Sequence, residues 1–318
     1  MSRETRARIK RVIQELGYRP NALARSLKQK KTHTLAAVVS SILNPFMTNT
    51  IRGAEDYCKE AGFNLILCNA DDDPQQELAY IQTLESKQID GLIISTTGHN
   101  NAALKELNLK GTPVVLFSRH VPEIGVDTVS VNNKQGVRMG IRHLMSLGRR
   151  NIAFFVLPYS EIPVTPRRER AQAYCDFLLE HGLPVDPSWL VESKCEEEVL
   201  AERIDNLLRT PGNRPTAIFG ANDLMTMSIV RVLVKKGIRV PEEMAVIGFD
   251  DWEWAPYLNP PVTVVAQPSY EMGRRAIERL VWRIKKQFGD APPELEQYEP
   301  ELIARQSCGE SLVKSITY

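Results

Sequence analysis

The chain has 318 residues, of which 43% are hydrophobic and 25% are charged, and its net charge at pH 7 is +1. This composition is typical of a soluble globular protein, and the length suffices for two domains or one bilobed unit. No apolar stretch approaches the roughly 20 residues of a membrane helix, and the N-terminus lacks the apolar region of a signal peptide. Five scattered cysteines without a CxxC pair fit a reducing compartment. We therefore expect a cytoplasmic protein without a membrane segment.

Positive charge is concentrated in residues 1–31, which carry ten Lys or Arg against two acids, a local charge of +8. Because the remaining residues sum to about −7, the pattern predicts that this segment alone contacts nucleic acid. Four of its apolar residues have the spacing i, i+3, i+4, i+7 and predict an amphipathic helix that ends at Gly17. They are Ile9, Val12, Ile13 and Leu16. A second short helix is expected after Pro20, with Asn21 as its cap. The alternative is a disordered basic tail.

From residue 32 onward, short apolar runs alternate with helical patterns in two successive series. The first series places strands at 34–40, 64–68, 91–95, 113–117 and 126–131, and helices at 47–60, 73–86, 102–107 and 133–147. The second places strands at 152–156, 189–191, 216–219, 244–249, 263–265 and 302–304, and helices at 165–180, 197–208, 223–236 and 270–288. Such alternation is typical of parallel α/β sheets with right-handed crossovers. Two series imply two similar lobes with a cleft between them.

Linear motifs of common enzyme and metal sites are absent from the sequence. It has no GxGxxG after the first strand, no GxxxxGK[ST], no GxSxG and no HExxH among its five histidines. Three consecutive acids, Asp71–Asp73, lack the ligand spacing of a calcium loop and are interpreted as a solvated helix start. The sequence therefore predicts neither an enzyme nor a metal or cofactor site.

An ordered set of short segments resembles one family, the lactose repressor (LacI/GalR) family of bacterial transcription regulators. The segments are Ser2–Leu27, Asn44-Pro45-Phe46 with Gly53 and Glu55, Asp90-Gly91, Gly148–Ile152, Ala221-Asn222-Asp223, Val240-Pro241-Glu242, Gly248-Phe249-Asp250-Asp251, Pro260–Thr263, Gln267-Pro268 and Arg305-Gln306-Ser307. Each segment alone is a weak signal, but together, in this order and spacing, they are highly specific. The resemblance covers essentially the whole chain.

The resemblance implies an α/β, bilobed, periplasmic-binding-protein-like fold made of two parallel-sheet subdomains. Residues 1–31 would be a partial DNA-binding headpiece, namely its third helix and the hinge helix, and residues 32–318 the effector-binding domain. Within that domain we expect an N-subdomain of about 32–150 plus 263–290 and a C-subdomain of about 151–262 plus 291–318. The first two helices of the family's helix-turn-helix headpiece, including the base-reading one, have no counterpart in this sequence.

The resemblance also assigns DNA contacts to the short helix near Asn21. Leu27 stands where the family inserts a leucine wedge into the minor groove, and Ala24 is small enough for a close approach. Arg25 and Lys28 can neutralise phosphates. The alternative is an ordinary linker helix with a buried leucine. Because so short a helix is marginal alone in water, we expect it to fold on DNA.

The family's effector residues map onto strand ends and onto one helix. Asp250 would accept hydrogen bonds from effector hydroxyls, and Arg170 matches the family's effector-binding arginine, whereas Arg167 and Arg168 are interpreted as solvated charges. Asn222 would either contact the effector or cap the helix that follows it. Three aromatic residues are expected either as flat apolar walls or as core. They are Phe46, Phe219 and Trp252.

Ser118 stands where many relatives carry an aspartate, directly before Arg119. The loss of a carboxylate beside retained arginines makes the pocket less negative, which favours a sugar acid or sugar phosphate over a neutral sugar. We therefore predict a homodimeric or tetrameric, ligand-responsive regulator that binds operator DNA and a small-molecule effector, and that represses sugar or sugar-acid catabolism. The alternatives are a solute-binding receptor of the same fold and a cleft enzyme that acts on sugars.

Overall fold

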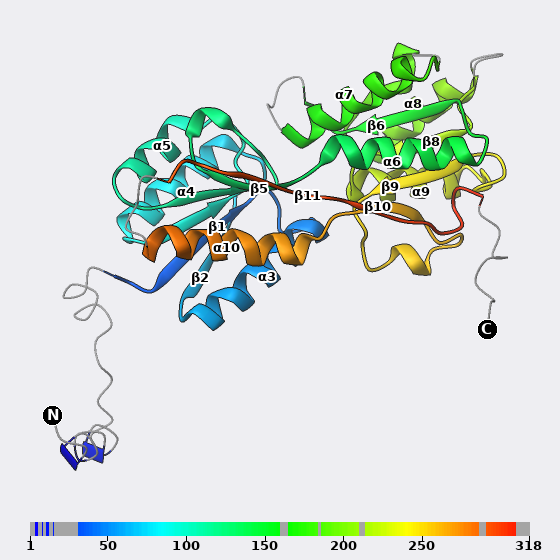
Figure 1. Ribbon diagram of the computed structural model, residues 1–318. Helices are drawn as coiled ribbons and strands as arrows, with labels where there is room; N and C mark the ends of the chain where they lie inside the picture. Colours follow the sequence, from blue (N-terminus) through cyan, green and yellow to red (C-terminus); the bar gives the residue numbers. More distant parts are fainter. Residues whose placement is uncertain are drawn as a thin grey trace.

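The computed structural model describes residues 31–159, 165–183, 186–209, 214–285 and 291–309, together with residues 4, 5, 8, 11, 12 and 15. The residues predicted to contact DNA (Asn21, Ala24, Arg25, Leu27 and Lys28) lie outside this described part of the chain. The described residues form two α/β lobes side by side (Figure 1). The predicted fold class is therefore confirmed.

The first lobe contains a parallel sheet whose order is β11-β5-β4-β3-β1-β2. Its strands are β1 (Thr34–Val39), β2 (Asn64–Asn69), β3 (Gly91–Ile94), β4 (Val114–Phe117), β5 (Asp127–Val131) and β11 (Leu295–Tyr298). The central strands β1, β3 and β4 are apolar along almost their whole length because helices cover both faces of the sheet.

The second lobe repeats this arrangement with the order β12-β10-β9-β8-β6-β7. Its strands are β6 (Ile152–Val156), β7 (Leu190–Glu192), β8 (Ala217–Gly220), β9 (Ala245–Phe249), β10 (Thr263–Ala266) and β12 (Glu301–Ile303). All neighbours pair in parallel except β12, which runs antiparallel to β10 at the edge of the sheet. The two lobes therefore share one strand order and differ in the direction of one edge strand.

Helices cover both faces of each sheet and enclose one large apolar cluster on each face. The first lobe has α3 (Pro45–Ala61) and α10 (Ser269–Lys285) on one face and α4 (Pro74–Ser86) and α5 (Asn101–Leu109) on the other. The second has α6 (Asn133–Ser146) and α7 (Thr165–Glu180) on one face and α8 (Glu197–Arg209) and α9 (Asp223–Lys235) on the other. Short 3₁₀ turns occur at η1 (Pro122–Ile124), η2 (Pro187–Trp189) and η3 (Ala255–Tyr257).

Local sequence sets where the cleft-facing helices of the first lobe begin. Asn44 precedes Pro45, and its side chain accepts a hydrogen bond from the Met47 amide. Helix α3 therefore begins at the end of the loop that follows β1. Asp73 and Pro74 begin α4 in the same way. The helix start expected at Asp71–Asp73 is therefore confirmed, and Asp73 is its cap.

Helix α10 crosses α3 at unusually close range, as Figure 1 shows for the orange and blue helices of the first lobe. A Cβ atom added at Gly273 would lie 1.8 Å from the carbonyl oxygen of Thr50, and one at Gly53 would lie 2.0 Å from that of Tyr270. Only glycine allows the two backbones to approach this closely. This contact holds the C-terminal helix on the first lobe.

Three segments connect the lobes: the one between β5 and α6, the one between β10 and α10, and the one between β11 and β12. The expected subdomains placed 263–290 in the first lobe and 291–318 in the second. Strand pairing instead puts Thr263–Ala266 beside β9 in the second sheet and Leu295–Tyr298 beside β5 in the first. The expectation differs from the structure here because the apolar pattern of a strand does not say which of two sheets the strand joins.

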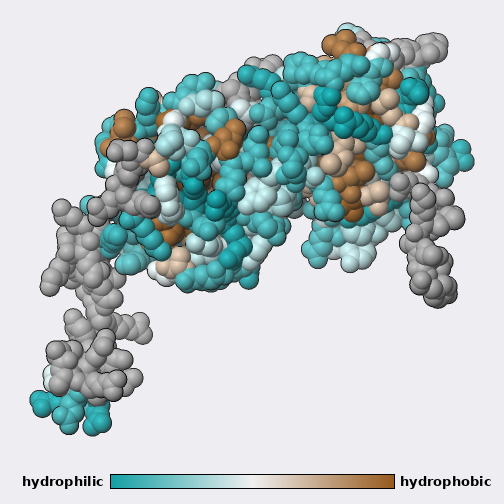
Figure 2. Space-filling model, in the orientation of Figure 1, coloured by the Kyte–Doolittle hydropathy of each residue, from teal (hydrophilic) through white to brown (hydrophobic). Residues whose placement is uncertain are grey.

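Hydrophilic residues cover most of the face shown in Figure 2, and apolar side chains gather in patches, mainly on the second lobe. The apolar residues of β1, β3, β4, β6, β8 and β9 are buried in the cores, whereas Leu67 of β2 and Leu295 of β11 are exposed. In the described part of the chain, no helix is both long and apolar enough to cross a bilayer.

Candidate effector site

Two adjoining cavities lie between the lobes, at the carboxyl ends of both parallel sheets. The inner cavity has a volume of about 110 Å³ and the outer one about 450 Å³. They share Phe46, Asp250 and Gln267 as lining residues. Ligands of open α/β sheets bind in this place because loops from many strands converge there. The predicted cleft between two lobes is therefore present in the structure.

The two lobes present equivalent strand ends to the inner cavity. Ser118 follows β4 and Asp250 follows β9, and both have left-handed backbones, with φ of 66° and 77°. The amide of each donates a hydrogen bond to the next strand, Ser118 to Val129 and Asp250 to Val265, both at 2.8 Å. A non-glycine residue in this conformation costs about 1–3 kcal/mol. Both positions thus carry backbone strain at the rim of the cleft.

Arg170 crosses the inner cavity from α7 and is 6% exposed. Its Nε donates to Asn133 Oδ1 at 2.8 Å and one terminal nitrogen donates to the Ala221 carbonyl at 2.6 Å. The guanidinium carbon lies 3.5 Å from the ring centroid of Phe249. Burial lowers the pKa of Arg170, and the nearby Asp250 opposes that shift. The arginine is therefore held in one orientation before any ligand arrives.

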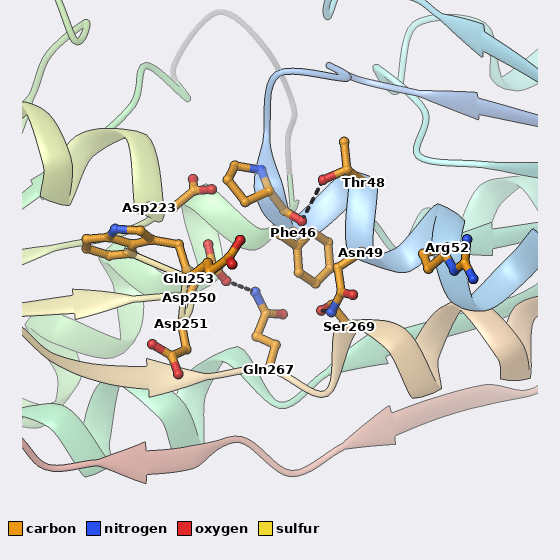
Figure 3. A pocket seen from close by; sticks show the side chains of 12 residues that line it. Phe46, Thr48, Asn49, Arg52, Asp223, Asp250, Asp251, Glu253, Gln267 and Ser269 are labelled. Carbon is orange, nitrogen blue, oxygen red and sulfur yellow. Dashed lines mark hydrogen bonds between the residues drawn. The ribbon is translucent and has the colours of Figure 1, made fainter. Parts of the chain in front are cut away.

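Two buried carboxyl groups face Arg170 from the second lobe. The carboxylate of Asp250 accepts a hydrogen bond from Gln267, which is drawn as a dashed line in Figure 3. Burial raises the pKa of Asp250, and Arg170 opposes this effect. Burial and the charge of Asp250 raise the pKa of Asp223 to about 7. Burial and the mutual repulsion of the two carboxyl groups therefore favour the protonated form of one of them.

Asn222 caps α9, since its side chain accepts a hydrogen bond from the Met225 amide at 3.0 Å. It also lines the inner cavity, so one residue serves the helix and the cleft together. The neighbouring Asp223 accepts hydrogen bonds from the Leu224 amide at 2.7 Å and from Asn44 of the first lobe at 3.4 Å. The two predicted roles of Asn222 are therefore compatible.

A positively charged group occupies another part of the inner cavity. Arg119, beside Ser118, is 5% exposed and forms an ion pair with Asp72 at 2.7 Å. Arg167 reaches the same carboxylate from α7 at 2.8 Å. The interpretation of Arg167 and Asp72 as solvated charges is wrong, because both line the cavity and the side chain of Arg167 is 17% exposed. Arg168 is exposed, as expected.

The three predicted aromatic walls have different positions. Phe46 lines both cavities, and Figure 3 shows its ring between Asp250 and Asn49. Trp252 is largely buried and lines the outer cavity. Phe219 is fully buried, and its ring packs edge-on against that of Phe154. Of the two roles expected for these aromatics, a wall of the cleft or a core residue, Phe219 has the core role. Its side chain points into the α6–α7 layer because successive residues of a strand face opposite sides of the sheet.

Sequence reasoning missed four cleft residues: Asp72, Arg167, Asp223 as a cavity group, and Gln267. Gln267 directly follows β10, so the rule that strand ends line the cleft could have identified it. No sequence signal distinguishes Arg167 from Arg168. Among the described residues, no group of three or more His, Cys, Asp or Glu side chains is arranged to hold a metal ion.

Several known proteins are similar to this chain in sequence. The sequence model described as "Periplasmic binding proteins and sugar binding domain of LacI family" matches residues 32–299. The chain belongs to the LacI family. "Probable HTH-type transcriptional regulator EndR" of Paenibacillus polymyxa is 35% identical over 309 residues, which cover 96% of this chain and 90% of the relative. "HTH-type transcriptional regulator KdgR" of Bacillus subtilis is 32% identical over 300 residues, or 94% and 87% of the two chains. Both relatives carry the name of HTH-type transcriptional regulators.

Solved structures of LacI-family regulators have the same fold. A "transcriptional regulator CelR-cellobiose complex" superposes with a TM-score of 0.76 at 30% identity and covers 96% of this chain and 91% of the other. A LacI family transcriptional regulator from Enterococcus faecium with bound ribose has a TM-score of 0.75 at 28% identity, with 86% and 98% covered. Both of these neighbours hold a sugar.

Proposed function

We propose that this LacI-family chain is a transcriptional repressor whose effector is a polyhydroxylated small molecule, of the sugar or sugar-acid class, bound between the lobes. The observation that carries the proposal is the buried Asp250 beside Gln267 and Arg170 at the carboxyl end of β9. Neighbouring regulators with bound cellobiose and ribose support the same class of ligand.

The polar groups of the cleft suit hydroxyl recognition. A carboxylate accepts hydrogen bonds from sugar hydroxyls, while the amides of Gln267 and Asn222 offer both donors and acceptors. Phe46 and Trp252 supply apolar surface against which the C–H face of a sugar ring packs. A few fixed polar groups within an otherwise apolar wall give a small-molecule site its specificity.

Effector binding and DNA binding are linked through the relative orientation of the lobes. A ligand that contacts both lobes favours one orientation, and the basic residues 1–31 precede β1 of the first lobe in the sequence. In a homodimer, a change in lobe orientation alters the separation of the two basic segments and hence their fit to operator DNA. Because such linkage is reciprocal, the effector must change DNA affinity by the factor by which DNA changes effector affinity.

The test is Asp250→Asn, which keeps the size of the side chain and tolerates the left-handed backbone. Loss of a charged hydrogen-bond acceptor should weaken sugar binding by about 1.5–3 kcal/mol, or roughly tenfold to a hundredfold. Calorimetry with ribose, cellobiose and the corresponding sugar acids measures the effect. The control is Asp71→Asn, since Asp71 is exposed and has the same left-handed conformation. Unchanged affinity in Asp250→Asn would remove Asp250 from the site.

Fluorescence anisotropy with duplex DNA from the promoter region of the gene that encodes this chain tests the coupling between effector binding and DNA binding. A ligand that stabilises the protein should also change its affinity for that duplex. A stabilising ligand without any effect on DNA binding at several salt concentrations would contradict the proposed regulation.

A further inference from the structure

The group formed by Asp72, Arg119 and Arg167 has one carboxylate between two guanidinium groups. Each arginine contacts a different oxygen of Asp72, Arg119 at 2.7 Å and Arg167 at 2.8 Å. All three line the inner cavity. Two cations against one anion leave one positive charge in excess at this place, where the side chains of Arg119 and Arg167 are only 6% and 17% exposed. Buried charge of this kind is unfavourable unless an anion balances it.

Backbone carbonyls hold both guanidinium groups in place. Arg119 donates to the Thr96 carbonyl at 3.0 Å, and Arg167 donates to the Pro158 carbonyl at 3.0 Å. A guanidinium has five N–H donors in a fixed planar fork. Bonds to Asp72 and to these carbonyls therefore leave donors on each arginine for a further acceptor. Burial lowers the pKa of Arg167, as expected of a cation whose charge is incompletely balanced.

The inner cavity is therefore polar along its length. Arg119 and Arg167 make one part positive, and Asp250 supplies a carboxyl group at the other part, beside Arg170. A ligand matches this arrangement when it carries an anionic group at one end and hydroxyl donors at the other. A neutral sugar satisfies only the part at Asp250.

We propose that Arg119 and Arg167 form a subsite for the carboxylate of the effector, whose hydroxyl groups reach Asp250. The effector would then be a sugar acid. A carboxylate fits better than a phosphate because the excess is a single positive charge, and carboxylate matches the guanidinium fork with two parallel hydrogen bonds. This inference rests on the proposed function and adds to it the charge of the ligand and a specificity-determining residue, Arg167.

The subsite is built from both lobes. Arg119 and Asp72 belong to the first lobe, whereas Arg167 lies in the first turn of α7 in the second. An anion held by both arginines joins the lobes in addition to Asp72. The carboxylate of the effector thus contributes directly to the lobe orientation on which the regulation depends.

The experiment compares acids with their neutral counterparts on the full chain. Galacturonate is paired with galactose and glucuronate with glucose, and glucose 6-phosphate represents the phosphates. Thermal shift ranks the ligands, and calorimetry gives their affinities for wild type, Arg167→Gln and Arg168→Gln. Arg168 is the matched control because it is the adjacent arginine of α7 but is exposed. We expect the acids to stabilise wild type more than their neutral counterparts do.

Arg167→Gln should weaken acid binding by about tenfold to a hundredfold and leave the affinity for the neutral partner unchanged. Arg168→Gln should change neither. If only the neutral sugars, or only the phosphate, stabilise wild type, the inference is overturned but the proposed function is not. Equal losses of acid affinity in Arg167→Gln and Arg168→Gln would also overturn the inference. Failure of every member of the panel to stabilise wild type would contradict both.

Discussion

Asp223 provides a direct test of the electrostatics of the cleft. Its carboxyl group is buried, and its Oδ2 has no hydrogen-bond partner among the described residues. In Asp223→Asn, the remaining oxygen keeps the hydrogen bonds from Leu224 and Asn44 that Oδ1 accepts now. The substitution therefore removes the ionisable group and leaves most of the local packing intact.

The magnitude follows from the pKa of Asp223, which burial and the charge of Asp250 raise from 3.8 to about 7. A carboxyl whose pKa is higher in the folded state stabilises the fold while it is protonated. That stability is complete below the unfolded pKa and is lost as the pH rises through the folded pKa. About three pKa units correspond to about 4 kcal/mol. Wild type should lose this stability between about pH 4 and pH 7, and Asp223→Asn should not.

Urea unfolding of both proteins at about pH 4.5 and about pH 8 measures the effect. We expect the stability difference between Asp223→Asn and wild type to shift in favour of the variant by about 3 kcal/mol from the lower to the higher pH. Asp71→Asn removes an exposed carboxyl and serves as the control. If Asp223→Asn and wild type change in parallel between the two pH values, Asp223 is ionised in the fold at low pH and the reasoning fails.

Two further predictions concern the first lobe. Gly273→Ala should destabilise the protein by about 1–3 kcal/mol in urea unfolding, because its Cβ would lie 1.8 Å from the Thr50 carbonyl oxygen. If Gly273→Ala instead stabilises the protein, as alanine normally does within a helix, then α3 and α10 can separate freely. Burial alone would raise the pKa of Asp127, but hydrogen bonds from Arg283 and Arg279 outweigh it and hold this pKa below its usual range. Asp127→Asn should therefore cost about 3 kcal/mol at neutral pH. The difference from wild type should shrink as the pH falls below about 4, and a pH-independent difference would argue against the ion pairs.

Neighbouring residues in the sequence specify much of the fold. Apolar runs between helical patterns predict every strand except β11 (Leu295–Tyr298), which lacks such a run, and their alternation predicts parallel sheets, as observed except at β12. Helix starts were predictable where an Asx residue precedes a proline, as at Asp73 and Pro74. The strand-end residues Ser118, Asn222 and Asp250 line the cleft because the carboxyl ends of parallel strands share one edge of a sheet.

The sequence by itself thus determined the class of fold, the presence of a cleft and most of the strand-end groups around it, because these follow from local patterns. Only the tertiary structure decided which sheet β10 and β11 join, that Arg167 faces Asp72 while Arg168 is exposed, and that Phe219 is core. It also decided that Asp223 and Asp250 lie close enough for one to raise the pKa of the other. Each of these features depends on contacts between residues far apart in the chain, and the energies of such contacts arise only once both lobes have folded.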